Sequence, residues 1–270
     1  MVFGPMTAVA FALAAAAPFQ AAGTDRLVDA GGVKLHIRCD GERAAGAPLV
    51  VLEAGAGNSA KTWNDVFAPI AQFARVCAYD RVGMGTSEKA PKVPTFTSSV
   101  EMLHALLRAA DERPPYVMAG HSYGGAMARF FATRYPGEVA GLVLVDSSHE
   151  DQVNRFAALQ RAIAPAAPAR AAGPPGETID LQGMAEEMGR APWRANIPLV
   201  VLTHTAPPVN PNSDAREDIW IELQRELATR SPQSEHIVAP KSGHYIQNDE
   251  PPLVIEAIRR VIANATRPRI

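Results

Sequence analysis

A serine set between glycines is the strongest chemical signal in this chain. Residues 120–125 read Gly-His-Ser-Tyr-Gly-Gly, after an apolar run and before a helical pattern. A Gly-x-Ser-x-Gly sequence between a strand and a helix is typical of a sharp turn that exposes the serine hydroxyl, and only small residues fit beside such a turn. The next backbone N–H, at the positive end of the helix, faces the charge that develops on a carbonyl oxygen. The pattern predicts acyl transfer by Ser122, with the Tyr123 N–H as an oxyanion donor.

A serine hydroxyl is a weak nucleophile at neutral pH, so it needs a base, and that base needs an orienting acid. Among the seven histidines, His244 lies directly after the last predicted strand and before the last predicted helix. In a parallel sheet this position falls on the same edge as Ser122, so we expect His244 to be the base. His121 lies inside the turn and is expected to point away from the serine.

Two aspartates compete for the role of the acid. Asp146 directly follows the apolar run at 142–145, and triad members meet at strand ends. Asp214 comes well after the following strand, and Glu217 follows it at the spacing of a capping box, which favours a helix N-cap. We expect Asp146 to be the acid and keep Asp214 as the alternative. The simpler interpretation of Asp146 is a structural loop carboxylate.

The small-residue loop at 54–57 is expected to supply the second oxyanion donor. Its sequence, Ala-Gly-Ala-Gly, lets the backbone approach a substrate closely, and the donor is expected to be the Ala56 N–H. Gly55, His149 and His204 are the expected substrate-binding residues, because they lie in loops that follow strands.

Three other side chains have structural interpretations. Glu53 and Asp80 end predicted strands and are expected to fix local loops by hydrogen bonding. Trp220 lies on a predicted helix, where ordinary packing is the more common role of a tryptophan.

The order of apolar runs and helical patterns predicts an α/β fold. Two alternating segments separated by Gly31 and Gly32 predict an antiparallel hairpin. The later strands are continuously apolar and alternate with helices, which favours a mostly parallel central sheet with helices on both faces. Ser98 and Glu101 form a capping-box pattern at the expected start of one helix. The expected strands are 26–29, 33–39, 48–52, 75–79, 116–119, 139–145, 197–202 and 235–239, and the expected helices are 66–73, 98–110, 126–135 and 252–263.

The segment 147–196 interrupts this alternation with proline-rich runs between two short helical patterns. We interpret it as a cap over the carboxyl ends of the strands, inserted into a core formed by 23–146 and 197–270. A plain surface excursion is the alternative.

Residues 1–22 are apolar and rich in alanine and resemble a secretory signal, although the first basic residue is Arg26. We expect a periplasmic or secreted protein, with a cytoplasmic one as the alternative.

Composition limits the partners. The chain is 47% hydrophobic and 20% charged, as is ordinary for a soluble enzyme, and its net charge of −2 favours neither nucleic acid nor an anionic membrane. The apolar run at 6–19 is too rich in alanine to span a bilayer comfortably, so we expect no integral membrane span in the mature protein.

Cys39 and Cys77 make no metal framework. They are expected to be buried free thiols or, after export, a disulfide between adjacent strands.

Taken together, these motifs resemble the α/β-hydrolase superfamily from about Leu27 to Ala263. The resemblance implies a serine-esterase-like member with a short cap between its sixth and seventh strands. The segments that carry it are 52–57, 79–87, 120–125, 144–147 and 242–244.

The chain departs from the superfamily pattern at two places. Many members have His-Gly where Ala54 and Gly55 stand here. Many also carry an aspartate just after strand seven, whereas residues 203–206 contain no carboxylate. Some members take their acid from the end of strand six, which is the position of Asp146.

The triad and the resemblance predict hydrolysis of a small carboxylic ester through an acyl-enzyme intermediate. Amide or peptide hydrolysis and a triad-based lyase reaction are the alternatives on the same fold, and a non-catalytic binding protein is a third. The chemistry implies no cofactor and no metal. The sequence does not indicate the oligomeric state.

Overall fold

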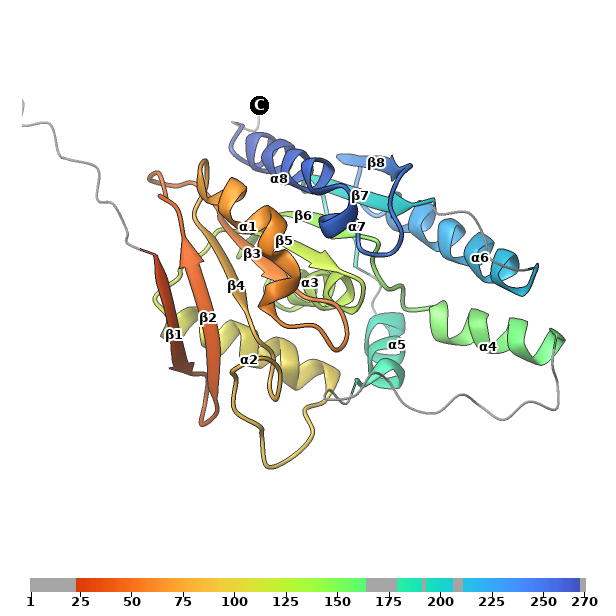
Figure 1. Cartoon of the computed structure of the whole chain (residues 1–270), viewed down its shortest axis with the longest axis horizontal. Coiled ribbons are helices and arrows are strands. Elements are labelled where there is room, and N and C mark those ends of the chain that lie inside the picture. The colour runs from red at the N-terminus through yellow and green to blue at the C-terminus, as the bar shows by residue number, and fades with distance from the viewer. Residues whose placement is uncertain (1–22, 164–178, 191–192, 206–210, 268–270) are drawn as a thin grey trace, which may run out of the picture.

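Eight strands form one sheet in the computed structural model, which describes residues 23–163, 179–190, 193–205 and 211–267. The strands are β1 (Thr24–Asp29), β2 (Lys34–Asp40), β3 (Leu49–Glu53), β4 (Val76–Tyr79), β5 (Tyr116–His121), β6 (Val139–Val145), β7 (Leu199–His204) and β8 (Ser234–Ala239). Their order across the sheet is β1-β2-β4-β3-β5-β6-β7-β8 (Figure 1). The pairs β1–β2 and β2–β4 are antiparallel and the rest are parallel. The expected hairpin and mostly parallel sheet are confirmed.

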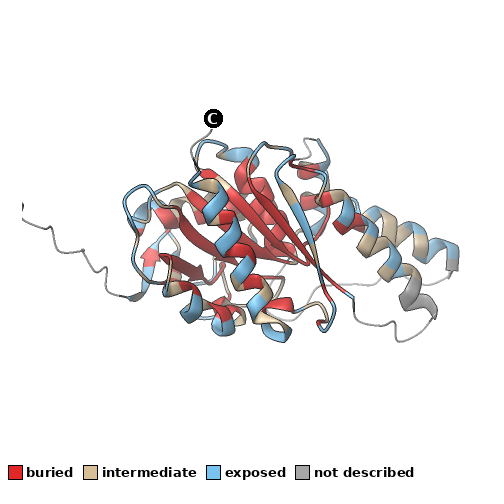
Figure 2. Ribbon diagram, turned by 90° about the horizontal axis from the view of Figure 1, so that it is seen from above, coloured by how far each residue is buried: buried red, intermediate tan, exposed pale blue. Residues whose placement is uncertain are grey.

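Helices cover both faces of the sheet. They are α1 (Asn64–Ala71), α2 (Phe96–Ala109), α3 (Tyr123–Arg134), α4 (Gln152–Ile163), α5 (Leu181–Arg190), α6 (Pro211–Leu227), α7 (Ile246–Asp249) and α8 (Pro251–Ala265), with a 3-10 turn η1 (Ala60–Trp63). Successive strand residues face opposite sides, so Val51 and Met118 join one core while Val50 and Val117 join the other. Residues of α2 and α3 complete the first core, and residues of α1 and α8 complete the second. Figure 2 shows the buried strands between helices whose outer sides are exposed.

The start of α2 differs from the expected one. The helix begins at Phe96, and the side chain of Thr95 accepts a hydrogen bond from the Ser98 N–H at 3.1 Å. The expected capping box of Ser98 and Glu101 is therefore wrong, because Thr95 already takes the N-cap position. Glu101 forms an ion pair with Arg134 of α3 instead.

Cys39 and Cys77 form a disulfide. They are register partners on the antiparallel strands β2 and β4, and their Cα atoms are 4.1 Å apart. The interpretation as two free thiols is therefore wrong, and the alternative of a bond between adjacent strands is confirmed.

The connection between β6 and β7 carries α4 and α5. Met184 and Met188 of α5 are buried in the core beside α2, while α4 packs against α6 (Figure 1). This is the stretch predicted to form a cap, and that role stays a prediction.

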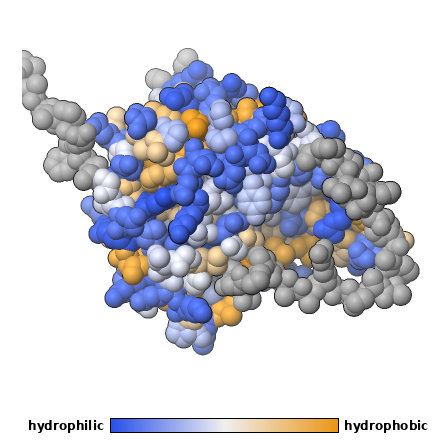
Figure 3. Space-filling view, viewed as in Figure 1, coloured by the Kyte–Doolittle hydropathy of each residue, from blue (hydrophilic) through white to orange (hydrophobic). Residues whose placement is uncertain are grey.

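The segments 1–22 and 164–178 lie outside the described residues. Within the described ranges, no helix has the length and apolar character needed to cross a membrane. Figure 3 shows that polar residues prevail on one face of the molecule.

Candidate active site

Ser122 stands on a sharp turn between β5 and α3. Its backbone has φ 52° and ψ −122°, a conformation that is strained for a residue with a side chain. The Ser122 N–H donates to the Val145 carbonyl oxygen at 3.1 Å, which ties the turn to the end of the neighbouring strand β6. This is the strand–turn–helix geometry that the sequence predicted.

The glycines around the turn are there because neighbouring atoms leave no room for a side chain. A Cβ at Gly120 would collide with the Gly124 carbonyl, and a Cβ at Gly124 would collide with the Glu53 carbonyl. Gly125 lies equally close to the Ser147 side chain. The sequence therefore needs small residues here for the reason expected.

Ser122 and His244 line the same cavity, which has a volume of about 300 Å³. Ser122 follows the end of β5, and His244 lies in the loop between β8 and α7. Their shared cavity confirms that both lie on one edge of the sheet. The other lining residues are Ser148, Gln152, Phe156, His204, Arg216, Glu217 and Trp220.

Asp146 directly follows β6 and is fully buried. Its Oδ2 accepts a hydrogen bond from His244 Nδ1 at 2.6 Å. Burial alone would raise the pKa of Asp146, but hydrogen bonds from His204 and His244 outweigh it and lower the pKa to about 2. Asp146 is therefore a carboxylate at neutral pH, and His244 must carry its proton on Nδ1. This leaves His244 Nε2 to act as a base.

His204, an expected substrate contact, lines the cavity and also binds Asp146. Its Nδ1 lies 2.6 Å from Asp146 Oδ2, and its Nε2 lies 3.0 Å from an oxygen of Glu217. Burial lowers the pKa of His204, but the hydrogen bond and charge of Asp146, together with Glu217, outweigh burial and raise it. The Trp220 indole N–H donates to Asp146 Oδ1 at 3.0 Å, so ordinary packing is not its only role.

His149 lies away from the cavity where it was expected. It is fully buried, and its Nε2 is 3.2 Å from Arg230 Nη2. Burial, with a smaller effect of Arg129 and Arg230, lowers the pKa of His149 to about 3 despite the neighbouring Glu150. A neutral histidine in this cluster supports the loop after β6 and does not face the substrate cavity.

Arg81 holds the loop that follows β3. Its guanidinium donates to the carbonyl oxygens of Ala54 and Gly55 at 2.6 Å each and pairs with Glu53 at 2.6 Å. With these carbonyls bound, the segment that bears Ala56 has a fixed orientation. Glu53 thus fixes a loop, as expected.

Asp80 fixes a second loop, also as expected, because its Oδ1 accepts from the Ala60 N–H at 2.7 Å.

His121 has a role that sequence reasoning missed. Its Nε2 donates to the His244 carbonyl oxygen at 2.9 Å, so it supports the loop of the proposed base. Burial and the nearby His244 lower its pKa to about 3, which keeps the ring neutral. A Cβ on Gly55 would lie 2.6 Å from His121 Nδ1, so Gly55 makes room for this ring.

The alternative acid Asp214 falls in α6, which begins at Pro211. An N-cap role for Asp214 is therefore wrong, since the helix starts three residues earlier. Its side chain lies outside the described residues.

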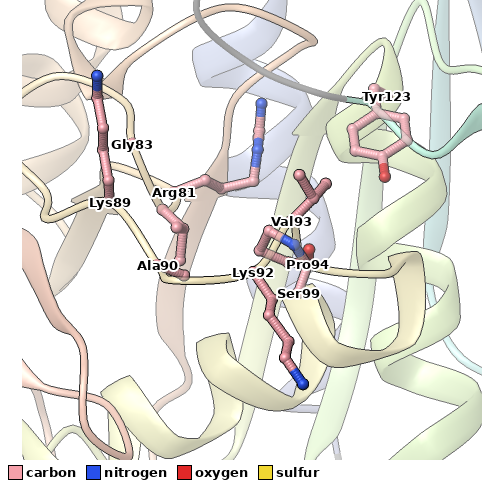
Figure 4. A pocket seen from close by; sticks show the side chains of 10 residues that line it. Arg81, Gly83, Lys89, Ala90, Lys92, Val93, Pro94, Ser99 and Tyr123 are labelled. Atoms are coloured by element: carbon pink, nitrogen blue, oxygen red, sulfur yellow. The ribbon is translucent and has the colours of Figure 1, made fainter.

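Tyr123 also lines a separate hollow of about 180 Å³ beside Arg81 and Ser99. Lys89 and Lys92 border it, but Figure 4 shows their ammonium groups pointing in different directions. The hollow therefore lacks the converging cations of an anion site.

Comparisons with known proteins agree with the fold. A family model described as alpha/beta hydrolase fold matches residues 47–179. The uncharacterized protein YqjL of Bacillus subtilis (strain 168) is 30% identical over 209 residues, which are 77% of this chain and 81% of that protein. The chain belongs to the α/β-hydrolase superfamily. This membership supports the view that the protein is a hydrolase.

Solved structures of two hydrolases share the fold over most of the chain. An esterase from Thermogutta terrifontis, with malate bound, aligns with a TM-score of 0.66 at 22% identity over 90% of this chain and 100% of that one. An epoxide hydrolase from Vigna radiata aligns with a TM-score of 0.63 at 17% identity over 89% of this chain and 98% of that one. At these identities the likeness shows the fold alone.

Proposed function

We propose that the protein is a serine hydrolase that cleaves a carboxylic ester of a small molecule. The observation that carries the proposal is the cavity shared by Ser122 and His244, with His244 hydrogen-bonded to the buried carboxylate of Asp146. In this arrangement a hydroxyl on a strained turn shares a cavity with an imidazole whose tautomer is set by a buried carboxylate.

The proposed reaction has two halves. His244 Nε2 takes the proton of Ser122 as Oγ attacks the ester carbonyl, and the resulting oxyanion is held by the N–H groups of Tyr123 and Ala56. His244 then gives this proton to the departing alcohol, which leaves an acyl group on Ser122. In the second half, His244 removes a proton from water, water attacks the acyl carbonyl, and the acid product leaves with Ser122 restored.

The wall of the cavity supports a substrate that carries an anionic group. The Arg216 guanidinium lies 4.2 Å from the centre of the Phe156 ring, and both residues line the cavity with Ser122. A guanidinium held against an aromatic face retains its donors for a carboxylate. The proposed substrates are therefore small esters with a carboxylate on the acyl or alcohol part.

A panel of substrates on the wild type and Ser122→Ala tests the esterase proposal. We expect the wild type to hydrolyse p-nitrophenyl esters and to bind a fluorophosphonate probe covalently, and Ser122→Ala to do neither. Ser234→Ala, at the opposite end of β8, is the matched control and should behave as the wild type. Faster turnover of aminoacyl p-nitroanilides would favour the amide hydrolase, and an unlabelled wild type would favour a binding protein.

Export is a further part of the proposal. The Cys39–Cys77 disulfide supports an oxidising compartment, because such bonds are rare in the cytosol. Cell fractionation and N-terminal sequencing of the mature protein test it. We expect the protein outside the cytoplasm with a new N-terminus, and an intact cytoplasmic chain would contradict export.

A further inference from the structure

Two imidazoles share one oxygen of the Asp146 carboxylate. The Nδ1 atoms of His204 and His244 each lie 2.6 Å from Asp146 Oδ2. The other oxygen, Oδ1, accepts from the Trp220 indole at 3.0 Å and from the His204 backbone N–H at 3.3 Å. Each oxygen of the Asp146 carboxylate thus accepts two hydrogen bonds, and His244 supplies only one of the four.

Parallel pairing of β6 and β7 places His204 at this position. Val145, the last residue of β6, is the register partner of Leu202, and the Asp146 N–H donates to the Leu202 carbonyl oxygen at 2.8 Å. His204 therefore ends β7 directly beside the acid that follows β6.

The positions of the protons follow from the acceptors. The Asp146 carboxylate only accepts, so both Nδ1 atoms carry hydrogens. His204 Nε2 lies 3.0 Å from an oxygen of a second carboxyl group, that of Glu217, in an ion-pair contact. Hydrogen bonds therefore link His204 through Asp146 to His244, and Glu217 lies in ion-pair contact with the far side of the His204 ring.

These distances indicate protons rather than a metal ion between the groups. Asp146, His204 and His244 present ligand atoms within 4.8 Å of one another, as a metal site would. Two ligands about 2.0–2.1 Å from zinc in a tetrahedral site are about 3.3 Å apart. The observed Nδ1–Oδ2 separations of 2.6 Å are those of charge-assisted hydrogen bonds.

We propose that His204, held by Glu217, is a positioning residue that divides the hydrogen-bonding capacity of Asp146 between two imidazoles. The proposal rests on the triad proposed above. Because His204 takes part of the carboxylate's negative charge, less remains to stabilise a proton on His244 Nε2.

The charged and titratable groups around His204 agree with this role. Asp146 faces it from the end of β6, Glu217 from α6 and His244 from the loop after β8, with the His204 and His244 ring centres 6.2 Å apart. Arg216, also on α6, lines the same cavity. Among the described residues, Glu217 and Asp146 are the carboxyl groups in contact with His204.

The pH profile of kcat/KM on a neutral ester tests the proposal with His204→Asn. The asparagine amide keeps a donor near the position of Nδ1 but carries no charge and does not reach Glu217. Asp146 then stabilises a proton on His244 more strongly, so the acidic limb should move to higher pH by about 0.5–1 unit. His204→Ala should move it further, and Glu217→Gln should move it in the same direction by less.

His236→Asn is the matched control, because His236 lies on β8 and bonds to the Thr203 hydroxyl at 2.8 Å, away from Asp146. Its acidic limb should coincide with that of the wild type. A uniform loss of kcat in His204→Asn with an unmoved limb would mean a structural role alone and would overturn the proposal.

Proton NMR of Ser122→Ala reads the hydrogen bonds without any turnover. We expect two strongly deshielded imidazole N–H signals, of which one disappears in Ser122→Ala/His204→Asn. A single signal in Ser122→Ala would overturn the proposal, and so would esterase activity lost to a chelator and restored by Zn²⁺. Two signals in a protein that hydrolyses no ester would support the hydrogen-bond chain while contradicting the proposed function.

Discussion

At the residue scale, Asp146 is the point where distant parts of the chain meet. It takes hydrogen bonds from β7, from α6 and from the loop after β8, and its own place is set by β6. A buried carboxylate with three side-chain donors is a rigid support for a base.

Replacing Asp146 by asparagine tests its role as the triad acid. We expect Asp146→Asn to lose about 10²–10⁴-fold in turnover, because an amide neither fixes the Nδ1–H tautomer of His244 nor stabilises its charge. Steady-state kinetics on a p-nitrophenyl ester measures this. Asp214→Asn is the control and should keep near-normal turnover. The reverse result would make Asp214 the acid.

Replacing Arg216 by glutamine tests the preference for anionic esters. The ratio of kcat/KM for p-nitrophenyl hemisuccinate to that for p-nitrophenyl acetate should fall about tenfold, the equivalent of about 1.4 kcal/mol for a lost charged hydrogen bond. Arg225→Gln changes the same charge on α6, away from the cavity lining, and should leave the ratio unchanged. An unaltered ratio in Arg216→Gln would contradict the proposed substrate class.

Individual site residues differed in how well the sequence predicted them. Ser122 and Asp146 each directly follow a strand, and His244 lies in the loop after β8. Parallel strands bring their ends to one edge, so the proximity of these residues followed from the pattern. The contacts of His204 and Trp220 with Asp146 did not follow, because they depend on side-chain directions and on the path of α6. His149 likewise follows a strand, but its ring turns into a buried ionic cluster.

At the element scale, the turn between β5 and α3 depends on close approach of three segments. Gly124 lies against the end of β3, and Gly125 lies against the loop after β6. The turn therefore positions the loop after β3 and the loop after β6 as well as Ser122.

Replacing Gly124 by alanine should disturb this contact. A Cβ there meets backbone that has no freedom to move, so we expect a loss of stability of about 1–3 kcal/mol and a larger relative loss of kcat. Gly189→Ala is the matched control, since Gly189 lies in α5 with no atom within 4 Å of an added Cβ. It should be neutral or slightly stabilising. Urea unfolding and ester kinetics measure both variants, and equal behaviour would contradict the packing argument.

Element positions followed from hydrophobic patterning, and their ends followed less well. The buried parallel strands are continuous apolar runs, so their existence was clear. The start of α2 was missed because Thr95 caps the helix with no acidic residue in the first turn. Ser98 and Glu101 have the spacing of a capping box, but they lie inside the helix.

At the scale of the whole molecule, buried neutral histidines make stability depend on pH. The pKa values of His121 and His149 are lowered to about 3, mainly by burial, while unfolded histidine titrates near 6.5. Between pH 6.5 and pH 3 the unfolded chain therefore binds protons on these two histidines, whereas the folded protein does not. Their contribution to stability is complete above pH 6.5 and is lost as the pH falls towards 3.

Unfolding experiments between pH 6.5 and pH 4.5 test this. The free energy of unfolding should fall on acidification, with each histidine contributing up to about 1.4 kcal/mol per pH unit. His149→Gln should reduce this slope by about one proton, whatever its effect on stability at pH 7. The raised pKa of His204 has the opposite sign, because its contribution to stability is present below pH 6.5, so His204 does not add to the loss on acidification. An unchanged slope in His149→Gln would show that its burial is not responsible.

The separation of the site along the chain has a consequence for synthesis. His244 comes 98 residues after Asp146, and the polypeptide emerges from the ribosome in that order. A nascent chain thus contains the proposed nucleophile and the proposed acid long before the proposed base is made. A product terminated between these two residues would therefore carry the serine without the histidine proposed to activate it.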